Sequence, residues 1–161
     1  MLSRFSRFMS VLIAAVLMAT AAASEEPPWG TAKVQSIEYA PQKVVYDVAA
    51  RDVDTFSRVL DRVSYLNNIY HADPFGTSIV LVLHGDEIAF FGISDFDKYK
   101  DLVTRAQSLT VGGTIDIRMC EVAARAHGLA PEDIHGFVKL VPMADAELVR
   151  LQQEEGYVYM Q

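Results

Sequence analysis

The only cysteine of this chain, Cys120, is the residue whose type and position best suit chemistry. It directly follows a predicted strand and opens a predicted helix, where free backbone amides favour the thiolate form of the side chain. The thiolate is the form of cysteine that attacks other sulfur atoms. Arg118 adds positive charge nearby, whereas the carboxylate of Glu121 disfavours the thiolate. We therefore expect a modestly activated thiol at Cys120.

His84 directly follows another predicted strand and is the second candidate for chemistry. It suits a base or a hydrogen-bond donor close to Cys120, and a histidine that simply ends a strand explains it equally well. His71 falls at the opposite edge of the predicted sheet, and His127 and His135 flank loops, where we expect them to be solvated. The four histidines lack metal-ligand spacing, so we expect no metal and no cofactor.

Two kinds of apolar pattern must position these residues. Runs rich in β-branched residues predict strands, and apolar residues three or four positions apart predict helices. The strands are expected at residues 44–48, 79–83, 114–119, 137–141 and 157–160. The helices are expected at residues 52–70, 94–109, 120–127 and 145–155. Residues 88–91 fit either a short strand or a helical turn.

The alternation of strands and helices predicts an α/β fold, a three-layer α/β/α sandwich with a mainly parallel five-stranded sheet. All strands of a parallel sheet end at one edge, where ligands usually bind. His84, Cys120 and the Pro142-Met143 pair each follow a predicted strand, and the first strand ends near residues 49–52. We therefore expect these positions to gather along the carboxyl edge of the sheet. The strand order does not follow from the pattern.

The N-terminal segment has the pattern of a secretory signal peptide. Arg4 and Arg7 give a positive start, Phe8–Ala19 is an uncharged apolar run, and Ala21–Ala23 supplies the small residues of a cleavage site. An apolar run of this length is too short to span a bilayer comfortably. We expect export to the periplasm, cleavage after the last of these alanines and no membrane association afterwards. A retained membrane anchor is the alternative.

We divide the chain into a signal peptide at residues 1–23, an N-terminal arm at 24–42 and an α/β domain at 43–161. The arm contains a Pro-Pro pair and suits an extended conformation. Its apolar side chains are suited to docking on the domain or on a neighbouring subunit; they are Trp29, Val34, Ile37 and Tyr39.

Charge and cysteine content narrow the possible functions. Cleavage of the signal would leave 138 residues with 12 basic and 21 acidic side chains, a net charge of −9. Such an acidic surface repels nucleic acid and anionic membranes. A single cysteine cannot form a disulfide within the chain, so Cys120 is inert in the core, links two chains or reacts.

Several short motifs occur in a characteristic order. They are Leu66-Asn67-Asn68, His84-Gly85 at a strand end, Cys120 opening a helix that ends at Gly128, Pro131-Glu132-Asp133, Val141-Pro142, Leu151-Gln152 and Glu155-Gly156-Tyr157-Val158-Tyr159. In this ordered set the chain from Lys43 to Gln161 resembles the DsrE/DsrF-like sulfur relay family. The cysteine-to-glycine helix and the terminal Glu-Gly-Tyr-x-Tyr segment contribute most to the resemblance.

The resemblance implies a small α/β fold, assembly into homotrimers or homohexamers, and sulfur relay. In the family, the cysteine matching Cys120 accepts sulfane sulfur as a persulfide and passes it to another thiol. The chain would then be a periplasmic sulfur carrier or sulfurtransferase-like protein, and His84 would stabilise the bound sulfur anion. Its partners would be sulfur donor and acceptor proteins or small sulfur compounds.

Two other interpretations stay open. A non-catalytic oligomeric binding or scaffold protein of the same fold would bury Cys120 as a small apolar side chain. A cysteine hydrolase would need a histidine within hydrogen-bond reach of the thiol.

Overall fold

The computed structural model describes residues 28–161. The predicted signal peptide and its cleavage site lie outside these residues. The described chain divides into two compact units, and the second, Ile37–Gln161, holds the helices and strands described below. Residues 28–36 form no helix or strand. All four apolar side chains of the predicted arm are exposed, among them Trp29 and Val34.

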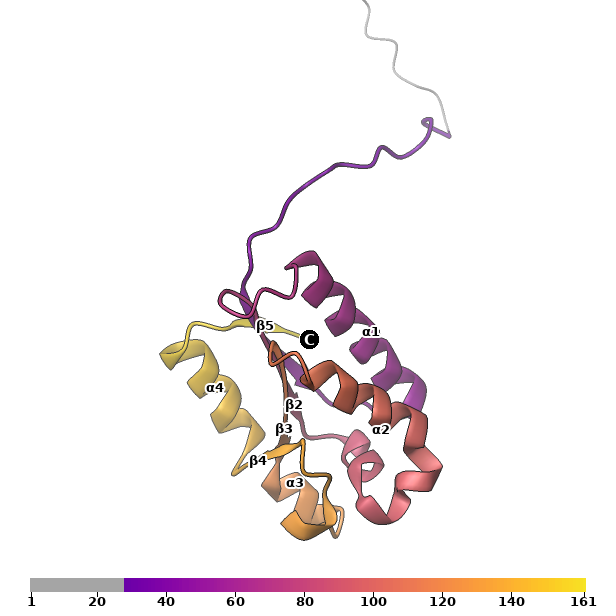
Figure 1. Cartoon of the computed structure of the whole chain (residues 1–161), viewed down its shortest axis with the longest axis vertical. Coiled ribbons are helices and arrows are strands. Elements are labelled where there is room, and N and C mark those ends of the chain that lie inside the picture. Colours follow the sequence, from indigo (N-terminus) through magenta and orange to yellow (C-terminus); the bar gives the residue numbers. More distant parts are fainter. Residues whose placement is uncertain (1–27) are drawn as a thin grey trace, which may run out of the picture. The chain divides into compact units, whose positions relative to one another are not determined.

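Five parallel strands form the sheet of the domain (Figure 1). They are β1 (Lys43–Val48), β2 (Ser78–Leu83), β3 (Ile115–Cys120), β4 (Lys139–Val141) and β5 (Val158–Met160). Their spatial order is β4-β3-β2-β1-β5, so the chain adds strands on one side of β1 and returns to its other side for β5. The predicted parallel five-stranded sheet is confirmed, and every pairing in it is parallel.

Helices α1 (Val53–Ile69) and α2 (Phe96–Thr110) cover one face of the sheet (Figure 1). The start of α1 is fixed by Asp52, whose carboxylate accepts a hydrogen bond from the backbone N–H of Thr55 at 2.7 Å. This bond satisfies one of the free amides at the helix start. The sequence therefore sets the point at which the chain leaves β1 and turns into α1.

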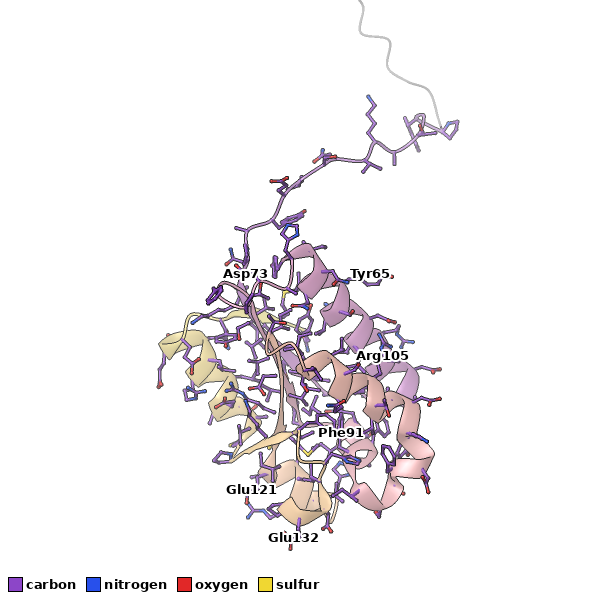
Figure 2. All side chains as sticks on the ribbon, viewed as in Figure 1. Tyr65, Asp73, Phe91, Arg105, Glu121 and Glu132 are labelled. Carbon is purple, nitrogen blue, oxygen red and sulfur yellow. The ribbon has the colours of Figure 1, made fainter. Side chains whose placement is uncertain are left out.

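The larger core lies between this helix layer and the sheet. Strand residues alternate between the two faces, so every second residue of β1, β2 and β3 enters this core. Phe56 and Phe91 are completely buried there, and their rings meet edge to face at 5.6 Å between centroids. Figure 2 shows Phe91 inside this layer, whereas Tyr65 and Glu132 lie on the outside.

A single long helix, α4 (Ala144–Glu154), covers the opposite face and contacts β1 and β2. The three layers of the predicted sandwich are therefore present. A smaller core on this side contains Val80, Leu148 and Cys120. The short helix α3 (Glu121–Ala126) contains six residues, fewer than two turns, and follows β3 directly.

Short 3-10 helices occupy several loops: η1 (Asp86–Phe91), η2 (Ile93–Asp95) and η3 (Pro131–Asp133). Residues 88–91, which fitted a strand or a helical turn, belong to η1. The strand expected at 137–141 is shorter than predicted and begins at Lys139. Within residues 28–161, no helix is long and apolar enough to cross a membrane.

His135 corrects one expectation from the sequence. Its ring lies 5.4 Å from that of Phe96 and 6.0 Å from that of Phe137, measured between centroids. Its Nε2 atom is buried without a hydrogen-bond partner in the described chain, and burial lowers the pKa of the imidazole. His135 is therefore half-buried rather than fully solvated, because aromatic neighbours pack against its ring. His127 is exposed, as expected.

Candidate functional site

The carboxyl edge of the sheet brings together residues that are far apart in the sequence. His84 follows β2, Cys120 ends β3, and Met143 lies between β4 and α4. All three line one cavity of about 250 Å³. Its wall is completed by Val122, Ala123, Ala126, Ala144 and Asp145. The gathering expected from strand ends is therefore present around Cys120.

Cys120 itself is a buried residue at the wall of this cavity. Only 5% of its surface is exposed. On the sheet side its neighbours are apolar, and it belongs to the smaller core with Val82 and Ala144. On the other side lies the cavity that it shares with His84. The cysteine thus combines an apolar setting with access to a space large enough for several sulfur atoms or waters, because one liquid water takes about 30 Å³.

The charged groups next to Cys120 are largely paired with one another. The Arg118 guanidinium donates to the Asp116 carboxylate at 2.9 Å and also bonds Glu147 of α4. Its positive charge is therefore committed to two carboxylates rather than to the thiol. Glu121 forms an ion pair with Arg125 at 3.3 Å, which offsets the negative charge of Glu121. The sequence suggested that the charges of Arg118 and Glu121 would act on the Cys120 thiol. Each of these charges is instead paired with an opposite charge.

His84 is held by a short hydrogen bond from its ring. Its Nε2 lies 2.6 Å from the Oδ1 atom of Asp47 on β1. The other oxygen of the same carboxylate accepts the hydroxyl of Tyr159 on β5, also at 2.6 Å. This bond to Asp47 raises the pKa of the Tyr159 hydroxyl, which therefore stays neutral and donates.

The bond to Asp47 also sets the tautomer of His84. An ionised carboxylate only accepts hydrogen bonds, so the Nε2 atom must carry the proton. In the neutral imidazole the Nδ1 atom is then the free acceptor, and in the protonated imidazole it becomes a second donor. The side chains of His84 and Asp47 are 32% and 19% exposed, so this pair is accessible from outside.

Beneath His84, a fully buried carboxylate fixes the loops that carry the site. Glu87 accepts the backbone N–H groups of His84 at 3.0 Å and Gly85 at 2.9 Å through Oε1. Its Oε2 accepts the backbone N–H of Ala50 at 2.7 Å. Glu87 thereby ties the segment after β1 to the segment after β2. Burial raises the pKa of this carboxyl, and the three N–H groups oppose that rise.

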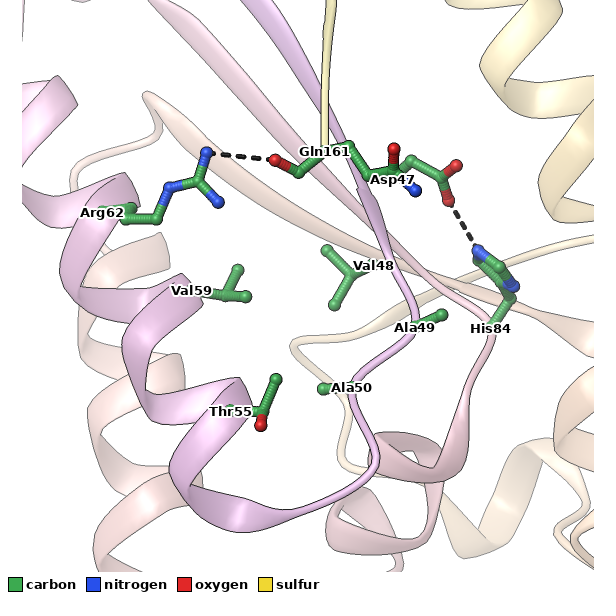
Figure 3. Close-up of a pocket in the computed structure, with 9 residues that line it drawn as sticks. All are labelled: Asp47, Val48, Ala49, Ala50, Thr55, Val59, Arg62, His84 and Gln161. Carbon is green, nitrogen blue, oxygen red and sulfur yellow. Dashed lines mark hydrogen bonds and ion pairs between the residues drawn. The ribbon is translucent and has the colours of Figure 1, made fainter.

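A second cavity of about 280 Å³ lies on the β1 side of His84 (Figure 3). Asp47 and His84 line it together with Thr55, Arg62 and Gln161. The Arg62 guanidinium bonds the backbone oxygen of Gln161 at 3.1 Å, as Figure 3 shows. His84 is therefore shared by two cavities, and its partner Asp47 belongs to the one that lacks the cysteine.

The remaining polar candidates lie elsewhere. The segment with Asn67 and Asn68 ends α1, where their carbonyls accept the N–H groups of Ala72 and His71. It leads into the turn before β2, at the amino edge of the sheet. Within residues 28–161 there is no group of three or more His, Cys, Asp and Glu side chains that could hold a metal ion.

Sequence reasoning missed three residues of this site: Asp47, Glu87 and Tyr159. One signal for Asp47 was present, because it is the only charged residue within the apolar run 44–48. Finding its partners requires the strand order, which brings β5 beside β1. Glu87 lies in a segment without a clear pattern and gives no comparable signal.

The fold defines a class of proteins, three-layer α/β/α domains with a fully parallel five-stranded sheet. Among solved structures, the chain is similar to a protein of unknown function, MTH1491, from Methanobacterium thermoautotrophicum. The two are 24% identical, with a TM-score of 0.51 over 74% of this chain and 97% of that one. At this identity the likeness supports the fold alone. No family model matches the chain, and no curated protein matches it.

Proposed function

We propose that this protein is an exported member of the DsrE/DsrF-like group that carries sulfane sulfur as a persulfide on Cys120. The observation that carries the proposal is the shared cavity of Cys120 and His84 at the carboxyl edge of the sheet. A sulfur carrier needs a thiol next to a protected space and a group that stabilises the bound sulfur anion. Cys120 supplies the first, and the protonated ring of His84, whose Nδ1 is then a donor, supplies the second.

The chemistry would be thiol exchange with sulfur as the transferred group. The Cys120 thiolate attacks the outer sulfur of a donor persulfide, the donor S–S bond breaks, and a new S–S bond forms on Cys120. The donor leaves as a thiolate. In the reverse direction an acceptor thiolate removes the outer sulfur from Cys120. Each step exchanges one S–S bond for another, so no oxidant or reductant is consumed.

The apolar part of the cavity suits this role. Val122 and Met143 are 53% and 47% exposed beside the buried sulfur, so the approach to Cys120 is mostly hydrocarbon. An apolar surround limits water around a reactive persulfide. Sulfur donors and acceptors would be small sulfur compounds or thiols carried on a narrow protein segment. Periplasmic location and assembly into homotrimers or homohexamers are parts of the same proposal.

A sulfur-transfer assay tests the proposal. The mature protein is incubated with polysulfide, freed of excess reagent and then given a small acceptor thiol, and the sulfane sulfur is measured by cyanolysis before and after. We expect close to one transferable sulfur per chain in the wild-type protein and none in the Cys120→Ser variant. Equal sulfur on the two proteins, or a loaded sulfur that no thiol removes, would refute the carrier.

Burial of Cys120 favours a second candidate, a non-catalytic oligomeric binding or scaffold protein. Only 5% of the residue is exposed, and apolar neighbours from β2 and α4 pack around it. Free cysteines are often small core residues of this kind. The two candidates differ in the reactivity of the native thiol. A scaffold cysteine is alkylated only after unfolding, whereas a carrier cysteine reacts in the native protein.

A further inference from the structure

Four polar or reactive side chains form a diagonal row across four neighbouring strands. From the edge strand β5 toward the centre of the sheet they are Tyr159 in β5, Asp47 in β1, His84 directly after β2 and Cys120 at the end of β3. The first two contacts in the row are hydrogen bonds of 2.6 Å. The third is the cavity that His84 and Cys120 share.

The register of the sheet explains why this row forms. Tyr159 pairs with Val45, two positions before Asp47. Asp47 pairs with Val82, two positions before His84. Residues two apart on a strand project from the same face. Each member of the row therefore lies on the same face as the next and one step closer to the carboxyl edge.

The last two members of the row, His84 and Cys120, lie at the same height along their strands, unlike the earlier pairs. Leu83 pairs with Met119, so the next residues, His84 and Cys120, stand at the same height on neighbouring strands. Both line the cavity beside α4. The His84 ring is anchored through Nε2 on the Asp47 side, which leaves the Nδ1 atom as the ring nitrogen without a fixed partner.

We propose that Asp47 and Tyr159 are positioning residues that hold His84 so that its Nδ1 atom exchanges the proton needed for sulfur transfer at Cys120. This inference rests on the proposed sulfur carrier and assigns two residues to its chemistry. No hydrogen bond joins the two side chains directly, so the Cys120 thiol gives its proton to Nδ1 through one water in the shared cavity and then attacks the donor persulfide. The departing donor thiolate then takes the proton from Nδ1, so protons and electrons balance.

Other charged groups also face His84, and the test must separate them from Asp47. Asp145 of α4 lines the Cys120 cavity, and Arg62 of α1 lines the cavity on the other side. Glu87 of η1 binds the His84 backbone rather than the ring. Asp86 gives a matched control, because Asp86→Asn removes one negative charge two residues from His84, lies in neither cavity and touches no hydrogen bond of His84.

The first measurement uses the wild-type protein alone. Nitrogen-15 NMR of the His84 ring reports which ring nitrogen carries the proton at a pH above the imidazole titration. We expect the proton on Nε2. A ring with its proton mainly on Nδ1 would overturn the inference, because that nitrogen could not accept the thiol proton.

The second measurement is the rate of Cys120 alkylation by iodoacetamide in native protein, followed across the pH range in which imidazole titrates. At neutral pH we expect Asp47→Asn and His84→Gln each to slow the reaction about a hundredfold, the lower end of the range for positioned acid–base groups. Tyr159→Phe should slow it less, about two- to fivefold, because it removes one hydrogen bond to Asp47 and leaves the bond between Asp47 and His84 in place. Asp86→Asn should not slow it.

The double variant Asp47→Asn/His84→Gln distinguishes positioning from a general structural role. If Asp47 acts through His84, the double variant is no slower than His84→Gln alone. Additive losses, or an Asp47→Asn rate equal to wild type, would contradict the inference. Should alkylation follow these expectations while no sulfur is transferred, the positioning roles stand and the sulfur carrier fails. Should wild type and Asp47→Asn transfer sulfur equally well, the sulfur carrier stands and the positioning role of Asp47 fails.

Discussion

Replacing Glu87 by glutamine tests the part of the molecule that holds His84 in place. The Glu87 side chain is completely buried, and its two oxygens accept three backbone N–H groups. Glutamine has the same shape but only one accepting oxygen. That oxygen can keep the two bonds to His84 and Gly85. The new amide group then faces the N–H of Ala50, and two donors are left opposite each other.

The magnitude follows from this count of donors. A buried polar group without a partner costs about 1–3 kcal/mol. Glu87→Gln leaves the Ala50 N–H and the new amide group without hydrogen-bond acceptors, and it also removes the cost of burying a charge. We expect a net loss of about 1–3 kcal/mol at neutral pH. For a domain of this size that moves the urea midpoint by roughly 1 M.

The pH dependence has a definite sign. Burial raises the pKa of Glu87 above its value in the unfolded chain. The stability that this group contributes is then fully present below the unfolded pKa and is lost as the pH rises through the folded pKa. The advantage of wild type over Glu87→Gln should therefore shrink from acidic toward neutral pH.

Urea unfolding of both proteins at several pH values checks these expectations. The exposed neighbour Asp86 offers a control, since Asp86→Asn makes the same chemical change outside the buried network and should leave the midpoint unchanged. A neutral-pH difference below about 0.5 kcal/mol, the scatter of ordinary surface changes, would refute the role of Glu87. An advantage that grows with pH would refute the raised pKa.

The remaining predictions concern two neighbours of this network. A Cβ at Gly85 would lie 2.6 Å from the Glu87 Oε2 and 2.7 Å from the Ala49 Cα. Gly85→Ala should therefore lower the free energy of unfolding in urea by about 1–3 kcal/mol. Gly136→Ala is the control and should cost nothing, because nothing lies within 4 Å of a Cβ there. Glu147 bonds Arg150 and Arg118, which lower its pKa, and Glu147→Gln should cost about 1–3 kcal/mol at neutral pH, less than a fully buried pair. A carboxyl with a lowered pKa contributes stability above its unfolded pKa, and this stability is lost as the pH falls through the folded pKa. The stability difference between wild type and Glu147→Gln should therefore shrink in acid. A difference that does not change with pH would contradict the pairing.

Much of the layered fold follows from local patterns in the sequence. The uniformly apolar run 79–83 is buried on both faces as β2, as expected for a central parallel strand. Asp52 caps α1, and Gly128 ends the Cys120 helix segment with a positive φ of 76°. These features depend on neighbours in the chain, so the sequence alone reveals them.

The site depends on contacts that local patterns do not contain. The position of Cys120 and His84 at one edge follows from their places after strands. Their connection to Asp47 and Tyr159 depends on the order of the strands, because β5 adds beside β1 rather than beside β4. The packing of His135 against Phe96 is likewise a contact between distant segments.

The most direct test of the proposed function is the mass of the proteolytic peptide that contains Cys120 after native protein has been treated with polysulfide. We expect this peptide to gain one sulfur atom and a thiol reductant to remove it. The gain should be absent from Cys120→Ser. A native peptide of unchanged mass, under conditions in which the unfolded chain does take up sulfur, would contradict the claim that Cys120 carries sulfur.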